Sequence, residues 1–300
     1  LIEENIFDRN GWDHRIGRSD ATIFAHNVYI QRSCNDVVFR GNISMRASSH
    51  GVQLRPGGIA EENVFIQNPI GLLFANARQE QARPTDRVHD NLVLEGIALE
   101  PGEARGWGIH IQDVLQVTVS DNIVANSLTP DSGWGISMSG RSDDFVNSTV
   151  ITNNIVDDFG DAMFINPALV NEATITGNIL STNERAKSVI FYRSDNDGGI
   201  EYGGNYYRHT NDNEPFALGS NELTINEWQA EYDPQGGEML SQFLDEGRSV
   251  ADYARSLGLA DEEAFFEALR QQRRGNWDQR LTSDAIRAYF REAFTLTNAG

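Results

Sequence analysis

The chain has 300 residues, which is enough for a sizeable core in one domain or two. Its formal net charge of −20 disfavours binding to nucleic acid or to an anionic membrane surface. The single cysteine, Cys34, excludes an intrachain disulfide, and no apolar stretch is long enough to span a bilayer.

A seven-residue segment recurs along the first two thirds of the chain. Its third and fifth positions are apolar in every copy, and this alternation of period two is typical of a β-strand with one buried face. The copies are HNVYIQR (26–32), HGVQLRP (50–56), IGLLFAN (70–76), WGIHIQD (107–113), WGISMSG (134–140), DAMFINP (161–167) and SVIFYRS (188–194). Recurrence every ~20–50 residues indicates a solenoid.

A second pattern, an Asn followed by an apolar or aromatic residue, runs beside the first. Stacked Asn side chains can hydrogen-bond along a stack, and Asn tolerates the left-handed backbone region. One coil is therefore expected to contain a strand, a turn, a second strand and an Asn-bearing turn. The two patterns predict an all-β solenoid, a parallel β-helix, over residues 1–207. The Asn positions are Asn5, Asn42, Asn63, Asn91, Asn122, Asn154, Asn178 and Asn205.

The first residues, LIEENIF, already fit the Asn pattern in the middle of a coil. Because a β-helix needs a cap on its open end, we expect the sequence to be a fragment that lacks upstream coils and a secretion signal. The expected location is therefore secreted or periplasmic.

Polar excursions interrupt the coils. The first, residues 8–25, carries His14 and Arg15; the second is 76–89, and the third is 100–106. Loops that project from one edge of a rigid solenoid commonly build its binding wall, so we expect these segments to border a site.

The composition changes after residue 207. Residues 208–221 are expected to form a linker, and residues 222–300 a helical C-terminal cap that packs on the last coil. Helix-start signals stand at Thr224, Ser249 and Asp261, and a further one at Thr282.

Positions one, four and six of the repeated strand are expected to face outward. Parallel strands lie ~4.8 Å apart, so equivalent positions in consecutive copies should form adjacent rungs. Three of the six histidines fall on this stripe. The adjacent pairs expected in the first two copies are His26 with His50, Tyr29 with Gln53, and Gln31 with Arg55, with His110 and Gln112 further along.

These residue types suit abstraction of the proton next to a uronic carboxylate. The reaction needs a cation for the carboxylate, a base for the C5 proton and an acid for the leaving oxygen or the opposite face. Arg55 fits the first role, His50 or His26 the second, and Tyr29 the third or the second. The residues expected to bind the substrate are Gln31, Gln53, His110, Gln112, His14, Arg15 and Trp107.

The strand repeat, with HNVYIQ (26–31) and SSHGVQLRPGG (48–58), resembles the pectate-lyase-like right-handed β-helix superfamily, which includes polysaccharide lyases and mannuronan C5-epimerases. The chain looks similar to secreted bacterial β-helix proteins with a short helical tail, and the resemblance in fold covers residues 1–207. The resemblance implies a monomeric, carbohydrate-active enzyme, a lyase or epimerase with an anionic polysaccharide substrate. His50, Arg55 and Tyr29 would then have roles like those of the His, Arg and Tyr in such enzymes.

The chain also departs from that family. The epimerase motif Asp-Pro-His-Asp is absent, and the only lysine, Lys187, lies far from Arg55 in the sequence. The Lys/Arg pair and the calcium-binding acidic cluster of alginate lyases therefore cannot be placed. No cofactor or metal is expected. Calcium is left open without a motif to support it, and a metal held by His26 and His50 would lack a third ligand.

Two alternatives stay open. A glycoside hydrolase on the same fold would need paired carboxylates. A non-catalytic polysaccharide-binding or adhesion solenoid could stack sugar rings on Trp107 and Trp134, although these rings could equally cover the flank of the solenoid. The candidate carboxylates for the hydrolase are Asp143, Asp144, Asp157, Asp158 and Asp161.

Overall fold

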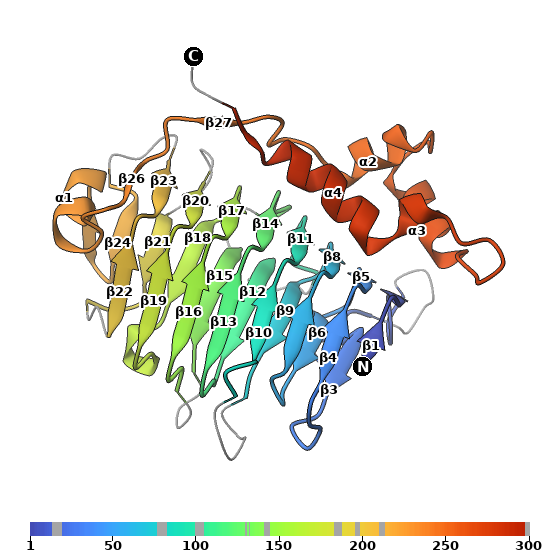
Figure 1. The fold of residues 1–300 in the computed structure, drawn as a ribbon, viewed down its shortest axis with the longest axis horizontal. Coiled ribbons are helices and arrows are strands. Elements are labelled where there is room, and N and C mark those ends of the chain that lie inside the picture. Colours follow the sequence, from blue (N-terminus) through green and yellow to red (C-terminus); the bar gives the residue numbers. More distant parts are fainter. Residues whose placement is uncertain are drawn as a thin grey trace.

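The computed structural model describes residues 1–13, 20–76, 83–99, 105–129, 131, 133–140, 145–182, 188–195, 199–209 and 214–297. Three stacked, mostly parallel sheets form a β-helix, and a small helical region follows (Figure 1). The predicted fold class is confirmed. Each coil contains three strands rather than two, because the Asn turn divides the β-rich run before each repeated strand into two short strands.

Sheet A has eight strands and contributes the first strand of each coil. In spatial order they are β1 (Ile2–Glu3), β4 (Val38–Arg40), β7 (Ile59–Glu61), β10 (Arg87–His89), β13 (Val117–Ser120), β16 (Thr149–Thr152), β19 (Ala173–Thr176) and β22 (Ile200–Gly203).

Sheet B has nine strands, and all but the last of them follow the Asn turn of a coil. Its strands are β2 (Ile6–Asp8), β5 (Ile43–Met45), β8 (Val64–Ile66), β11 (Leu92–Leu94), β14 (Ile123–Ala125), β17 (Ile155–Asp157), β20 (Ile179–Ser181), β23 (Tyr206–Arg208) and β26 (Gly237–Glu238).

Sheet C holds the seven-residue repeat that was found in the sequence. Its strands are β3 (Val28–Ile30), β6 (His50–Leu54), β9 (Ile70–Phe74), β12 (Trp107–Gln112), β15 (Trp134–Ser139), β18 (Asp161–Ile165), β21 (Ser188–Tyr192), β24 (Phe216–Leu218) and β25 (Asn221–Leu223), the last of them antiparallel. Pro167–Leu169 after β18 form a 3-10 turn, η1.

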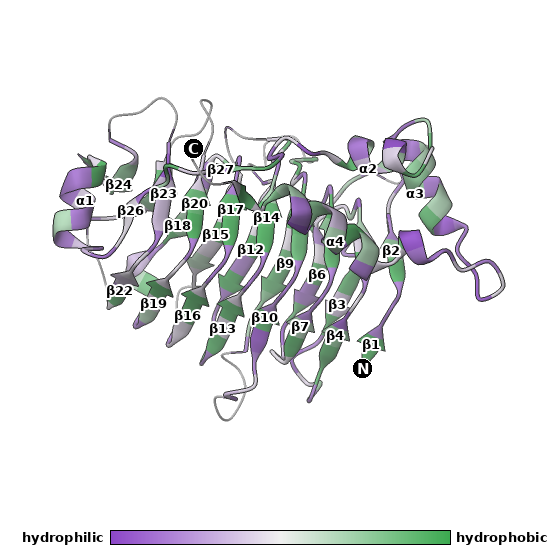
Figure 2. Ribbon diagram, turned by 45° about the horizontal axis from the view of Figure 1, so that its top comes forward, coloured by the Kyte–Doolittle hydropathy of each residue, from purple (hydrophilic) through white to green (hydrophobic). Residues whose placement is uncertain are grey.

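The third position of the repeat forms one interior column, as predicted. These side chains pair in register from coil to coil and are at most 9% exposed. Figure 2 shows the hydrophobic residues on successive strands of the stack. The column consists of Val28, Val52, Leu72, Ile109, Ile136, Met163 and Ile190.

The Asn side chains form a continuous hydrogen-bonded stack between sheets A and B. In each step, the backbone amide and the Nδ2 of one Asn donate to the Oδ1 of the Asn in the next coil; from Asn42 to Asn63 these distances are 2.9 and 3.1 Å. The stack ends where Asn205 donates to the carboxylate of Asp233. The left-handed residue of each turn is the one before the Asn, not the Asn itself: Glu4, Gly41, Glu62, Asp90, Asp121, Asn153, Gly177 and Gly204.

The last coil is covered by α1 (Ile225–Glu231), which begins at the predicted capping box of Thr224 and Glu227. The buried Trp228 of α1 stacks on Phe216 of β24, with ring centroids 4.6 Å apart. Residues 208–221, predicted to be a linker, include β24, which is the last parallel strand of sheet C. The solenoid therefore continues past the predicted boundary at 207.

The other helices lie elsewhere than predicted. The helices α2 (Val250–Ser256), α3 (Glu262–Arg270) and α4 (Ser283–Ala293) begin after the predicted caps Ser249, Asp261 and Thr282. They pack against the outer face of sheet B over the early coils, not against the last coil (Figure 1). The 3-10 turn η2 (Gln279–Leu281) precedes α4, and β27 (Gln242–Phe243) pairs antiparallel with β28 (Leu296–Thr297).

Two ion-pair clusters attach these helices to the solenoid. Arg46 donates to both carboxylate oxygens of Asp8, at 2.8 and 2.6 Å, and to Glu263 of α3 at 2.7 Å. Asp90 accepts from Arg287 of α4 at 2.8 Å. The Arg46–Asp8 pair is almost fully buried, so replacing either residue with a neutral one would leave the charge of the other uncompensated.

We predict that Asn122→Ala destabilises the protein. Asn122 is fully buried, and its Nδ2 donates to the carbonyls of Val88 and Ser120 and to Asn154. Alanine would leave buried backbone groups of two coils without a partner, at a cost of about 2 kcal/mol or more in the free energy of unfolding. The change in the free energy of unfolding is measured by denaturation in urea. The control is Asn171→Ala, whose hydrogen bond is exposed; equal stability of the two variants would contradict a structural role for the stack.

Candidate functional site

The outward face of sheet C brings the first two predicted histidines into direct contact. The Nδ1 atoms of His26 and His50 lie 3.0 Å apart, and their rings meet edge to face with centroids 4.6 Å apart. Tyr29 and Gln53 pair in register, as predicted. The 24-residue step between the copies thus places side chains from two coils side by side.

A hollow of about 580 Å³ opens over these residues. It is lined by Ile23, Phe24, His26, Tyr29, His50, Gln53, Arg55 and Arg105. All four predicted catalytic residues therefore line one hollow. We take it as the candidate functional site.

The backbone around His50 is fixed by close packing. A Cβ at Gly51 would lie 2.5 Å from the carbonyl oxygen of Gly71 and 2.9 Å from the Phe65 ring, so the second position of this copy must be glycine. The neighbouring Asn27 is buried and donates to Ser44 Oγ and to the carbonyl of Met45. These contacts hold the segments before β3 and β6 at the separation that the histidine pair needs.

Two polar residues of the site were missed by the sequence analysis. The fully buried Ser49 hydroxyl lies 2.8 Å from His50 Nδ1, and Arg105 donates from Nη1 to Ser49 Oγ, also at 2.8 Å. Arg105 closes the third polar excursion, which was predicted to border a site, although its contact with a residue 56 positions earlier could not be inferred. Ser49 stands within the quoted segment SSHGVQLRPGG.

Burial and nearby cations keep both imidazoles neutral. Burial, followed by the positive charges of Arg55 and Arg105, lowers the pKa of His26 to about 4. Burial also holds the pKa of His50 well below its usual range, with His26 and Arg105 adding to the effect. His50 is only 7% exposed, although it stands at an outward position of the repeat and lines the hollow.

A neutral pair in this geometry offers one base and one acid. Two neutral imidazoles carry two ring protons on four nitrogens. One of these protons forms the hydrogen bond between the two Nδ1 atoms, which lie 3.0 Å apart. The other proton must then sit on one Nε2, and the second Nε2 is left bare. The pair can therefore accept a proton at one ring and donate a proton from the other.

The remaining predicted side chains divide between the hollow and its surroundings. Tyr29 is 42% exposed and its ring packs on that of His26, with centroids 5.5 Å apart. Gln53 lines the hollow and is 4% exposed. Gln31 follows the end of β3, is exposed and does not line the hollow. His14 and Arg15 lie outside the described residues.

His110 and Gln112 form a separate cluster. Leu73 of β9 stands between Gln53 and His110 in the register of sheet C. His110 Nδ1 contacts the Ser137 hydroxyl at 2.7 Å, and Gln112 Nε2 lies 3.4 Å from His110 Nε2. Neither residue lines the hollow, but the charge of His110 also helps to lower the pKa of His50, so their substrate-binding role stays a prediction.

Trp107 belongs to a ladder of stacked rings on the same sheet. Its ring lies 4.2 Å from that of Trp134, which in turn lies 3.8 Å from Phe164. Trp107 also packs against the apolar cluster of Ile70 and Leu73. Because ring faces pack within this ladder, the position of the rings favours the flank-covering role over sugar stacking.

Of the carboxylates considered for a hydrolase, Asp157 and Asp158 line a separate hollow of about 430 Å³ together with Glu246 and Arg208, and Asp161 does not line it. Asp157 lies at the end of β17 in sheet B and pairs with Arg208 at 3.1 Å, whereas Asp161 begins β18 in sheet C. Burial raises the pKa of Asp157, and Arg208 also contacts Glu246. Asp143 and Asp144 lie outside the described residues.

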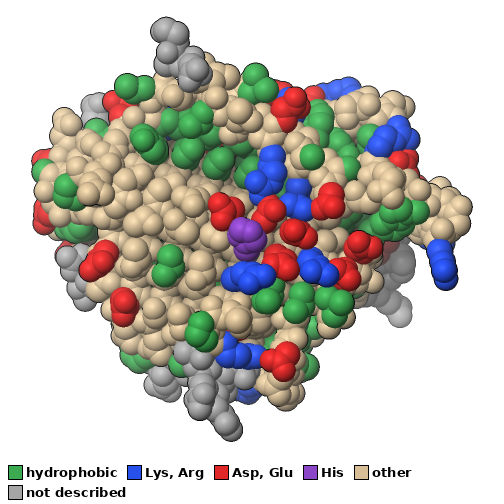
Figure 3. Space-filling model, viewed as in Figure 1, with side chains coloured by type: hydrophobic (Ala, Val, Ile, Leu, Met, Phe, Trp, Pro, Cys, Tyr) green, Lys and Arg blue, Asp and Glu red, His purple; other side chains and the backbone are tan. Residues whose placement is uncertain are grey.

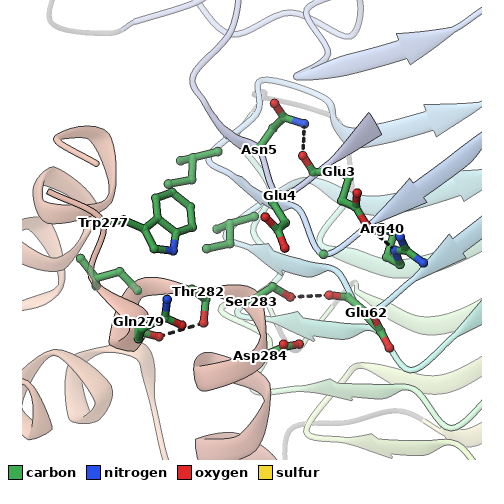
Figure 4. A pocket seen from close by; sticks show the side chains of 14 residues that line it. Glu3, Glu4, Asn5, Arg40, Glu62, Trp277, Gln279, Thr282, Ser283 and Asp284 are labelled. Atoms are coloured by element: carbon green, nitrogen blue, oxygen red, sulfur yellow. Dashed lines mark hydrogen bonds and ion pairs between the residues drawn. The ribbon is translucent and has the colours of Figure 1, made fainter. Parts of the chain in front are cut away.

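Other surfaces of the described chain lack this chemistry. A second hollow lies where the first coils meet the C-terminal region, with Trp277 on one side and Glu3 and Glu4 on the other (Figure 4). On the face shown in Figure 3, acidic and basic side chains are intermixed; on sheet A, Glu61 pairs with Arg87. Neither arrangement places two contacting histidines beside two arginines.

Among the described residues, no group of three or more His, Cys, Asp or Glu side chains is placed to hold a metal ion. In the same part of the chain, no helix has the length and apolar character needed to cross a membrane.

The fold and the hollow together define a parallel β-helix in which a histidine pair and two arginines line one hollow. Comparisons of the chain with protein-family models, with curated proteins and with solved structures give no match. Functional inference therefore rests on the geometry of the hollow.

We predict that the histidine pair makes stability depend on pH in the acid range. The pKa of His26 is about 4 in the folded protein against 6.5 in a free side chain, so the unfolded state binds more protons between these values. The contribution of His26 to the free energy of unfolding is fully present above about pH 6.5 and falls as the pH drops towards 4. The free energy of unfolding, measured in urea, should fall less between pH 7 and pH 4 in His26→Gln than in the parent protein. The control is His89→Gln, on sheet A beside Asp121; an unchanged loss in His26→Gln would contradict the prediction.

Proposed function

We propose that the hollow binds a uronic-acid-containing polysaccharide and abstracts the C5 proton of one sugar, in a β-elimination or an epimerisation. The observation that carries the proposal is the contact between two neutral imidazoles beside two guanidinium groups. A carbohydrate-active β-helix of the lyase or epimerase type is thus the function that the site supports best.

The guanidinium groups suit the carboxylate of the sugar. Arg55 and Arg105 line the hollow together and both act on the pKa of His26, so their charges lie close to the base. A guanidinium matches a carboxylate through two parallel hydrogen bonds. As the C5 proton leaves, negative charge grows on this carboxylate, and fixed cations stabilise that charge most when water is excluded. They also provide local attraction for an anion in a chain of net charge −20.

The histidine pair suits the proton transfers. The C5–H bond breaks, its proton passes to the bare Nε2, and the electron pair moves into the carboxylate as an enolate. In an elimination, the C4–O bond then breaks and the protonated Nε2 of the other ring, or the Tyr29 hydroxyl, supplies a proton to the leaving oxygen. In an epimerisation, the same donors return a proton to C5 from the opposite face. Gln53 and Tyr29 are placed to bind sugar hydroxyls.

The proposal is tested on a panel of uronic-acid polymers, including alginate, pectate and hyaluronan. Elimination is followed by the ultraviolet absorbance of the unsaturated product, and epimerisation by incorporation of solvent deuterium at C5. Turnover of at least one polymer is expected. Retention of a polymer on a column without turnover or exchange would support the binding-module alternative and overturn the proposal.

Two variants then test the site. We predict that His50→Ala lowers kcat by ~10²–10⁴, which is the usual contribution of a general acid or base. Arg55→Lys should also be costly, because a point charge does not replace the guanidinium fork. The matched controls are His89→Ala and Arg87→Lys on sheet A, which should turn over substrate at the parent rate. If His50→Ala and Arg55→Ala keep full activity on the true substrate, the hollow is not the active site.

A further inference from the structure

The Ser49 hydroxyl constrains the protons of the histidine pair. Its oxygen has two polar contacts in the described structure, with Arg105 Nη1 and with His50 Nδ1, each at 2.8 Å. A guanidinium group can only donate, so the oxygen accepts the bond from Arg105. The hydroxyl hydrogen of this fully buried side chain also needs an acceptor. His50 Nδ1 is the acceptor within reach.

The proton positions on both rings follow from this bond. If His50 Nδ1 accepts from Ser49, it carries no proton, and the neutral ring is protonated at Nε2. The contact between the two Nδ1 atoms at 3.0 Å still requires a hydrogen, which must then come from His26. His26 is therefore protonated at Nδ1 and bare at Nε2.

The opposite arrangement is less favourable. A proton on His50 Nδ1 would be shared between Ser49 Oγ and His26 Nδ1, and the hydroxyl hydrogen of Ser49 would lose its acceptor. Both arrangements contain one shared hydrogen bond at His50 Nδ1, so this feature does not discriminate between them. The buried hydroxyl does, because only one arrangement satisfies it.

We infer that His26 is the general base of the site and His50 the proton donor, and that Ser49, held by Arg105, is the positioning residue that sets this order. The inference rests on the proposed function for its catalytic part. It differs from the expectation from sequence, which left His50 and His26 equivalent as bases and did not include Ser49 or Arg105.

The proton inventory closes within the pair. The C5 proton passes to His26 Nε2, and the Nε2 proton of His50 passes to the leaving oxygen or to C5. The Nδ1 proton of His26 then moves across the contact to His50 Nδ1, which leaves both rings neutral and their tautomers exchanged. Proton exchange with solvent at the Nε2 atoms, followed by return of the Nδ1 proton to His26, restores the starting arrangement, which Ser49 favours.

The tautomers can be measured without any substrate. In protein labelled with ¹⁵N at histidine, at pH 7, we expect the His50 Nδ1 and the His26 Nε2 resonances to have the shifts of unprotonated nitrogens. In Ser49→Ala the preference should be lost and both rings should show averaged shifts. Ser48→Ala is the matched control, because it removes the adjacent buried hydroxyl, which bonds to the Thr22 carbonyl instead. A protonated Nδ1 on His50 in the parent protein, or unchanged shifts in Ser49→Ala, would overturn the inference.

The catalytic part is tested by separating proton abstraction from product formation. On a polymer that the parent protein turns over, His26→Ala should lose both product and deuterium exchange at C5. His50→Ala should lose product but keep exchange, because the base is still present. Exchange that survives in His26→Ala and disappears in His50→Ala would reverse the assignment. If the tautomers are as expected and no polymer is turned over, the proposed function fails while the proton arrangement set by Ser49 stands.

Discussion

The hydrogen-bonded stack of Asn side chains fixes the register of the coils, and the candidate site depends on that register. Each Asn binds the next through its backbone amide and its Nδ2, so a coil shifted by one residue would lose these bonds and also turn its interior column towards solvent. With the coils held in this way, Val28 pairs with Val52, and the 24 residues between His26 and His50 bring the two rings to 3.0 Å. The contact in the hollow is a local consequence of an interaction repeated along the whole solenoid.

The turns on either side of sheet B explain why the C-terminal helices lie over the early coils. These turns need a residue with positive φ, and outside glycine this position is filled mostly by polar side chains that point away from the coil. Several of them bind the helical region: Arg46 contacts Glu263, Glu95 accepts from the Val250 amide, and Asp90 contacts Arg287. The outer face of sheet B is apolar under the helices, and Ile155 and Ile179 of the later coils still pack against the same cluster.

The sequence was sufficient for the interior column, the Asn stack, the helix starts and the pairing of Tyr29 with Gln53, because each depends on a local or strictly repeated pattern. Sheet B was not separated from sheet A, since strands of three residues divided by a turn read as one run. The position of α2–α4 depends on contacts such as Arg46 with Glu263, 217 residues apart, which carry no periodic signal. For the same reason the contact of Arg105 could not be predicted. Ser49 could not be singled out either, because nothing in the sequence distinguishes a serine whose hydroxyl is buried beside a histidine from any other serine.

Under the proposed function, the arginines of the hollow would couple substrate binding to the strength of the base. In the free protein, burial and the charges of Arg55 and Arg105 lower the pKa of His26 to about 4, so the ring is neutral but a weak base. A carboxylate that binds both guanidinium groups offsets the second of these causes, and the pKa of His26 then rises. Burial is the larger cause and remains, so the ring stays neutral near pH 7 while its affinity for the C5 proton increases. The same cations that would hold the substrate thus keep the base unprotonated before binding and strengthen it afterwards, because attraction of the anion and repulsion of the proton have one electrostatic source.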